Sequence, residues 1–124
     1  MTQPLSLAQN SQWLKAVADE TRLLLLCLIA SESELCVCEL TGATELSQPK
    51  VSRHLSVLRD QGLLNTRKVE QWVYYRIAEG LPNWLVDLIN QQVLANHSAL
   101  QPLVKQLIQQ GPAQSRRLRW CKST

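Results

Sequence analysis

The chain has 124 residues, of which 45% are hydrophobic and 19% are charged. This length and composition suit one compact domain and leave too little apolar material for two independent cores. The longest apolar run covers residues 23–30, far short of the roughly 20 apolar residues that cross a bilayer. The first ten residues lack the basic and apolar regions of a secretion signal. We therefore expect a cytoplasmic protein without a membrane partner.

Charge is distributed unevenly, although the formal net charge is only +3. Six of the 10 acidic residues precede residue 46, whereas residues 47–76 hold six basic and two acidic residues. Four more basic residues follow between positions 116 and 122. Such asymmetry favours a polyanionic partner such as a nucleic acid, with an ordinary solvated surface as the plainer alternative.

Helical signals dominate the first half of the chain. A first helix precedes Asp19, whose carboxylate can accept the free amide protons of a second helix over residues 20–31. This second helix is apolar on nearly every side, which places it, with Cys27, at the buried centre of the fold. A short third helix is expected over residues 36–43, followed by a turn over residues 44–47.

The clearest start and stop signals bound a fourth helix. Ser47 is a typical N-cap residue, Pro49 is tolerated in a first turn, and Gly62 supplies the left-handed conformation that ends a helix. The apolar positions recur at helical spacing on the inward side: Val51, Leu55 and Leu58. The opposite side is rich in polar and basic groups that bind phosphates and base edges.

The sequence of the second half of the chain predicts a β-hairpin and a further helix. Residues 64–69 and 72–77 are rich in β-branched and aromatic side chains around a polar turn, which is typical of a β-hairpin. A last helix starts near Pro82 and is expected to break or kink at Pro102. A turn or short helix then covers residues 103–110.

These elements predict a mainly α fold with a small β-hairpin, in the order α-α-α-α-β-β-α. A short helix, a turn and a basic, capped helix form a helix-turn-helix, and the hairpin behind them forms a wing. The second helix of such a motif enters the major groove of DNA, and the wing reaches phosphates or the minor groove. We assign residues 1–110 to this winged helix-turn-helix domain and residues 111–124 to a flexible basic tail.

Five segments in this order resemble the ArsR/SmtB family of bacterial metalloregulatory repressors. They are ADETR at 18–22, ELCVCEL at 34–40, SQPKVSRHLSVL at 47–58, GLL at 62–64 and WVYYR at 72–76. The LCVC part resembles the arsenic-responsive branch of the family. The resemblance covers roughly residues 10–90. It implies a homodimeric repressor, not an enzyme, that binds double-stranded operator DNA and leaves it when trivalent arsenic or antimony binds.

The recognition helix and the wing supply the predicted DNA contacts. Gln48 and Arg53 are the base-reading candidates, because their forked side chains can form bidentate hydrogen bonds to adenine and guanine edges. Phosphate contacts are expected from the other polar residues: Ser47, Lys50, Ser52, His54, Arg67, Lys68 and Gln71.

The first and last helices are the predicted dimer interface, because they are more apolar than a monomer needs. A two-fold dimer would place two recognition helices about 34 Å apart, one turn of DNA. The alternative is that the same side chains close the core of a monomer. The predicted interface residues are Trp13, Trp84, Leu85, Leu88, Ile89 and Val93.

Cys36 and Cys38 carry the expected ligand chemistry, because soft thiolates select thiophilic ions. On an ideal helix, a spacing of two residues places the side chains roughly 200° apart, on opposite sides. Binding of one As(III) or Sb(III) ion by both cysteines would therefore require the start of the third helix to unwind. The unwound form would have the lower affinity for DNA.

A third sulfur is missing near this pair. Trivalent arsenic prefers three sulfurs in a pyramid, and Thr41 stands where some arsenic-responsive members carry a third cysteine. Cys121 in the tail is the leading substitute, from the same or the other protomer. A small-molecule thiol and a site with two sulfurs are the alternatives.

Signals other than arsenic could regulate a repressor with the same fold, and these alternatives stay open. The cysteines would also serve a thiol redox switch that releases DNA on oxidation. A zinc- or cadmium-responsive repressor is disfavoured, because Asp87 is followed two residues later by Ile89 and His97 has no paired His or Glu nearby. A DNA-binding protein that no ligand regulates is a further alternative. No glycine-rich phosphate loop or nucleophile turn supports an enzyme.

Overall fold

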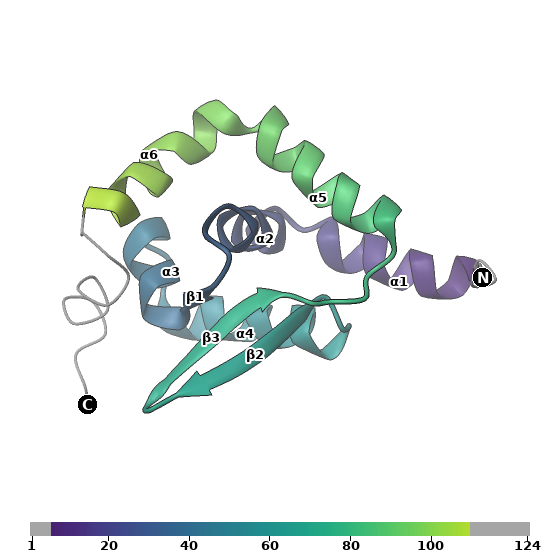
Figure 1. Cartoon of the computed structure of the whole chain (residues 1–124), viewed down its shortest axis with the longest axis horizontal. Helices are drawn as coiled ribbons and strands as arrows, with labels where there is room; N and C mark the ends of the chain where they lie inside the picture. Colours follow the sequence, from purple (N-terminus) through teal and green to yellow (C-terminus); the bar gives the residue numbers. More distant parts are fainter. Residues whose placement is uncertain (1–5, 110–124) are drawn as a thin grey trace.

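The computed structural model describes residues 6–109 as a mainly helical protein with one small sheet (Figure 1). Its elements are α1 (Leu7–Val17), α2 (Glu20–Glu32), β1 (Leu35–Cys36), α3 (Val37–Thr44), α4 (Gln48–Asp60), β2 (Leu64–Val69), β3 (Trp72–Ile77), α5 (Asn83–Ala95) and α6 (His97–Gln109). The predicted fold class is confirmed. The predicted tail, residues 111–124, and with it Cys121, lies outside the described residues.

Side-chain caps start the helices where the sequence predicts them. The Asp19 carboxylate accepts a hydrogen bond of 3.0 Å from the Arg22 N–H at the start of α2. This bond is the main reason why the pKa of Asp19 lies below its usual value. Ser47 Oγ accepts from the Lys50 N–H at 3.3 Å at the start of α4. Gly62, at φ +79°, follows the end of α4, as expected.

The apolar helix α2 forms the centre of the core. Leu25, Leu26, Leu28 and Ile29 are fully buried, and α2 contacts α1, α4, α5, α6 and β3. Figure 1 shows α2 nearly end-on, enclosed by the arc of α5 and α6 on one side and by α4 and the hairpin on the other. Its all-round apolar surface therefore has partners on every side.

The sheet has three antiparallel strands in the order β1-β3-β2. The predicted hairpin is present, with Val69 opposite Trp72 at its turn. The strand β1 was not predicted, because two residues are too short to display an alternating pattern. It places Cys36 opposite Tyr74 of β3. The segment between α2 and α3 is thus hydrogen-bonded to the wing.

A break or a kink of the last helix was predicted at Pro102, and the break is wrong, because Pro102 lies inside α6. The break falls at Asn96, between α5 and α6. The Asn96 side chain donates a hydrogen bond of 2.8 Å to the Gln92 carbonyl oxygen, which also accepts a bond of 3.0 Å from the Asn96 N–H. The side chain and the backbone of Asn96 thus share this acceptor at the C-cap of α5. Within residues 6–109, no helix is long and apolar enough to span a membrane.

Candidate DNA interface and cysteine site

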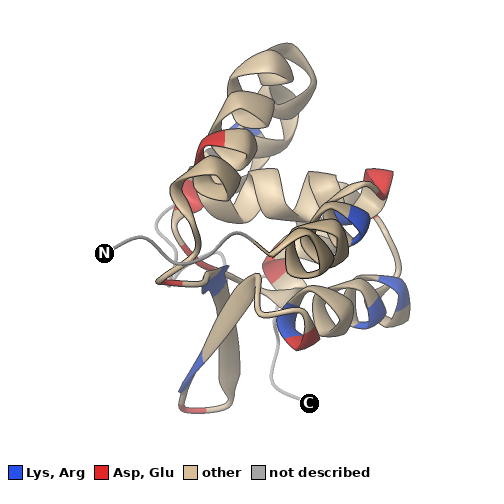
Figure 2. Cartoon of the chain, turned by 90° about the vertical axis from the view of Figure 1, so that its right-hand side faces the viewer, with Lys and Arg blue, Asp and Glu red and all other residues tan. Residues whose placement is uncertain are grey.

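The N-terminal half of α4 displays the predicted base-reading residues. Gln48 and Arg53 are exposed, as is Ser47 at the N-cap, while Lys50 and Ser52 are half-buried. Gln48 Nε2 donates to Ser52 Oγ at 2.8 Å, which orients the amide along the helix surface. Figure 2 shows the basic positions of α4 and of the hairpin on the same, lower side of the molecule. This side therefore combines positive charge with hydrogen-bonding side chains.

His54 differs from the other predicted phosphate ligands, because it faces another helix. Its side chain is half-buried, and its Nδ1 lies 3.4 Å from a guanidinium nitrogen of Arg22. Arg22 also donates a hydrogen bond of 2.6 Å to the Ala16 carbonyl oxygen at the end of α1. Arg22 and His54 thus join α1, α2 and α4. This arrangement favours a role for His54 in positioning the recognition helix.

On the wing, Lys68 and Gln71 are exposed, whereas the Arg67 side chain contacts other residues of the protein. The Arg67 guanidinium forms an ion pair with Glu34 and lies 5.4 Å from the centre of the Tyr74 ring. Hydrogen bonding to Glu34 and its negative charge raise the pKa of Arg67. Arg67 therefore ties the hairpin to the segment that leads into the cysteine pair. Glu34 was not predicted as its partner, because nothing in the local sequence pairs residues so far apart.

The two cysteine sulfurs already lie together, so the predicted need to unwind a helix is wrong. Cys36 Sγ and Cys38 Sγ are 3.3 Å apart. Cys36 has extended backbone (φ −92°, ψ 169°) as the N-cap of α3, and Cys38 lies in the first helical turn. The roughly 200° separation applies only to two residues inside one helix. The change from strand to helix between the two residues brings the sulfurs to one side.

Glu39 holds this arrangement in place. Its Oε1 accepts a hydrogen bond of 3.0 Å from the Cys36 N–H, and Cys36 and Glu39 together form a capping box. Glu39 is fully buried, the one buried charged residue among those the structure describes. Sequence reasoning missed it, although a glutamate three residues after an N-cap is the signature of a capping box.

The Cys36 thiol is protonated at neutral pH. Burial, and then the negative charge of Glu39, raise its pKa to about 12. Cys27 is buried in α2, as predicted, and burial also raises its pKa. In residues 6–109, no group of three or more His, Cys, Asp or Glu side chains is arranged to hold a metal ion. Any third donor to Cys36 and Cys38 comes from outside this part of the chain.

Aromatic side chains of the wing cover the sulfur pair. Cys36 and Tyr74 are 2% and 3% exposed and form a buried cluster of their own, separate from the main core. The partly buried side chains of Cys38 and Trp72 pack against this cluster. Trp72 and Tyr74 stand two positions apart on β3 and so point to the same face of the sheet. The cysteine site therefore lies between α3 and the wing, with Cys36 buried and Cys38 partly exposed.

Comparison with known proteins identifies the family. A sequence profile described as "Bacterial regulatory protein, arsR family" matches residues 19–66. The arsenic resistance transcriptional regulator ArsR1 of Pseudomonas putida is 50% identical over 97 residues, which cover 78% of this chain and 76% of that protein. The chain belongs to the ArsR family. The arsenical resistance operon repressor of Escherichia coli is 42% identical over 99 residues, or 80% of this chain and 85% of that protein.

Solved structures of similar proteins share the fold. Reduced HlyU from Vibrio cholerae has a TM-score of 0.61 and 38% identity, covering 73% of this chain and 88% of that one. A homodimeric winged helix-turn-helix DNA-binding domain from Mycobacterium bovis has a TM-score of 0.61 and 29% identity, covering 78% and 92%. The winged helix-turn-helix prediction is thereby confirmed.

In this ArsR-family chain, the predicted interface residues divide into two groups. Leu85 and Ile89 are 0% and 1% exposed within the single chain, so we remove them from the candidate dimer surface. Leu88 and Val93 are half-buried. Three large apolar side chains that were not predicted are exposed on α1 and α5: Leu7, Leu14 and Leu94.

Trp13 and Trp84 form a contact between α1 and α5. Their ring centres are 6.3 Å apart, and Trp13 Nε1 donates a hydrogen bond of 2.9 Å to the carbonyl oxygen of Gln61. Gln61 is the C-cap of the recognition helix α4. Both tryptophans are half-buried and belong to the edge of the main core. They connect the predicted dimer helices to α4.

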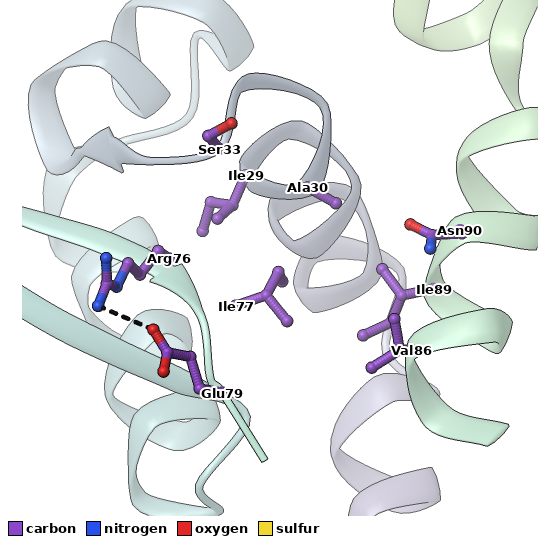
Figure 3. A pocket seen from close by; sticks show the side chains of 9 residues that line it. All are labelled: Ile29, Ala30, Ser33, Arg76, Ile77, Glu79, Val86, Ile89 and Asn90. Atoms are coloured by element: carbon purple, nitrogen blue, oxygen red, sulfur yellow. Dashed lines mark hydrogen bonds and ion pairs between the residues drawn. The ribbon is translucent and has the colours of Figure 1, made fainter. Parts of the chain in front are cut away.

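A pocket of about 260 Å³ lies between α2, β3 and α5 (Figure 3). Apolar side chains such as Ile29, Ile77 and Val86 line its interior, and Arg76 and Glu79 form a hydrogen bond of 3.4 Å on the side of β3. Its lining includes neither cysteines nor the predicted DNA contacts. We assign no role to this pocket.

Proposed function

We propose that the protein is a transcriptional repressor of arsenical resistance, acting in the bacterial cytoplasm. It binds double-stranded operator DNA as a homodimer and leaves it when trivalent arsenic or antimony binds Cys36 and Cys38. The observation that carries the proposal is the 3.3 Å separation of these two sulfurs at the start of the helix-turn-helix. The arsenic resistance regulators among its relatives support the choice of ligand.

The sulfur separation is compatible with one pyramidal ion bound by both cysteines. With bonds of about 2.3 Å, a tetrahedral zinc places two thiolate sulfurs about 3.8 Å apart, whereas a bond angle near 90° places them about 3.3 Å apart. Trivalent arsenic and antimony form such narrow pyramids, with a lone pair at the apex. Because only two sulfurs of the described residues meet here, we assign Cys121 as the third ligand.

The binding step needs no oxidant and no net release of protons. Arsenous acid exchanges each of its hydroxide groups for a cysteine sulfur. The bond between arsenic and oxygen breaks, an As–S bond forms, and the thiol proton leaves with the hydroxide as water. The raised pKa of Cys36 is therefore compatible with binding, because the protonated thiol is the form that the reaction consumes.

A thiol redox switch that starts with oxidation of Cys36 has less support. Oxidation proceeds through the thiolate, and a thiol with a pKa of about 12 forms very little thiolate at neutral pH. Cys36 is also buried, which hinders access of an oxidant. Cys36 itself is therefore a poor first target for a peroxide signal.

Arsenite binding to the purified, reduced chain tests this proposal. Titration with arsenite, followed by the near-ultraviolet absorption of As–S bonds, is expected to end at one ion per chain. Cys36→Ser and Cys38→Ser should each abolish tight binding, Cys121→Ser should weaken it, and Cys27→Ser should bind like the parent. Unchanged binding in both Cys36→Ser and Cys38→Ser would refute the assigned site.

A further inference from the structure

The wing contributes side chains to the cysteine site. A mechanism of DNA release that involves only α3 and α4 gives these side chains no role. Tyr74 lies opposite Cys36 in the antiparallel register of β1 and β3. Trp72 packs against the small cluster that Cys36 and Tyr74 form, together with Cys38. These aromatic side chains are separate from the main core, so they are not needed to fill it.

An apolar wall changes the chemistry of a thiolate-bound metalloid. Bonds between trivalent arsenic and sulfur exchange when water or another thiol attacks the arsenic atom. Aromatic rings packed beside the bonds exclude these nucleophiles and offer a polarisable surface to the ion. The main effect of such a wall is on the rate at which the ion leaves, because retention depends on the exclusion of competitors.

We propose that Trp72 and Tyr74 are ligand-site residues, forming a wall of the wing that retains the metalloid at Cys36 and Cys38. This inference rests on the proposed function and deepens it. Trp72 is the residue of the wall that a substitution can test, because its side chain is half-buried. Tyr74 is buried, and the Arg67 guanidinium lies over its ring. Because β3 is hydrogen-bonded to both β1 and β2, a displacement of the wall also displaces the wing.

The test compares ion release from variants of the full chain. Each protein is loaded with one equivalent of arsenite and mixed with an excess of a small dithiol, and the loss of As–S absorption is timed. Trp72→Ala should release arsenite about five- to tenfold faster than the parent, and Trp72→Phe should release it at close to the parent rate. Val73→Ala is the matched control, because Val73 is the neighbouring residue of β3 on its opposite face.

A second measurement does not depend on arsenite. In a Cys38→Ser background, alkylation of Cys36 by iodoacetamide at fixed pH should also be about five- to tenfold faster with Trp72→Ala than without it, because the wall no longer shields the sulfur. Thermal unfolding shows whether each variant is folded. If Trp72→Ala is unfolded, Trp72→Leu replaces it, since leucine retains apolar bulk without the aromatic ring.

The outcomes separate the inference from the proposed function. If the parent takes up no arsenite, the proposed function fails and the inference fails with it. If the parent binds arsenite but folded Trp72→Ala releases it at the parent rate, only the inference is overturned. Faster release in Trp72→Ala, with parent-like release in Val73→Ala and Trp72→Phe, supports the wall.

Discussion

The Glu39 carboxylate accepts a hydrogen bond of 3.0 Å from the Cys36 N–H, inside the protein and next to a candidate ligand sulfur. One side chain thus caps α3 and fixes the backbone at which strand turns into helix. This turn is also what brings the Cys36 and Cys38 sulfurs to one side. The stability of α3 and the geometry of the ligand site therefore depend on the same contact.

Replacing Glu39 should separate the contribution of its hydrogen bond to stability from the contribution of its negative charge. Glu39→Ala leaves the Cys36 N–H without this acceptor and is expected to lower the free energy of unfolding by about 1–2 kcal/mol. Glu39→Gln keeps an oxygen acceptor and should lose less. Urea denaturation followed by circular dichroism measures both. Equal losses in the two variants would show that the charge, not the hydrogen bond, carries the stability.

The reactivity of Cys36 should follow its raised pKa. Because the thiolate is the nucleophile, its alkylation rate should rise about tenfold per pH unit and show no plateau up to pH 10. Burial and Glu39 are the causes, since both disfavour the thiolate and place the pKa at about 12. The measurement uses Cys38→Ser, so that iodoacetamide labelling within this segment reports on Cys36 alone. A plateau near pH 9 would mean an ordinary thiol.

Arg53 should read a base rather than only neutralise charge. Arg53→Ala is expected to weaken operator binding by about 1–3 kcal/mol and to relax the preference for one base pair. Arg59→Ala is the matched control, because it removes the same charge from the C-terminal end of α4. Fluorescence anisotropy against the operator and against singly substituted duplexes measures both effects. An equal loss in the two variants would contradict base reading by Arg53.

A charge on α1 should dissociate the dimer. Leu14 is 43% exposed on α1, one of the two helices assigned to the interface. In a two-fold interface Leu14→Glu places the new charge on both protomers, where burial and mutual repulsion oppose association. Sedimentation velocity should therefore find monomers. Ile108→Glu on α6, where Ile108 is 62% exposed, is the control and should remain dimeric. The reverse pattern would move the interface to α6.

Local signals predicted much of this fold. Ser47 and Gly62 mark the limits of α4 through side-chain capping and a left-handed residue, which act within a few positions of the chain. The hairpin followed from its alternating, β-branched sequence. The break at Asn96 was missed because proline is the stronger breaker in general, whereas here Pro102 lies inside α6 and Asn96 is the C-cap of α5.

The sequence indicated which cysteines form the candidate site but not how their sulfurs are arranged. The sequence identifies Cys36 and Cys38 as thiophilic ligands, but their separation depends on β1, and β1 exists only because β3 is there to pair with it. The same pairing brings Tyr74 to the site from a distant part of the chain. Such contacts are set by tertiary structure, and helical spacing alone predicted the opposite arrangement of the two sulfurs.

Operator release by arsenite tests the central claim most directly. The reduced protein is bound to a fluorescent operator duplex, and anisotropy is followed during titration with arsenite, zinc and a mild oxidant in separate experiments. We predict that arsenite alone releases the parent protein, while Cys36→Ser and Cys38→Ser bind the operator normally and stay bound. Retention of the parent on DNA at saturating arsenite would contradict the account, as would release of the cysteine variants by arsenite.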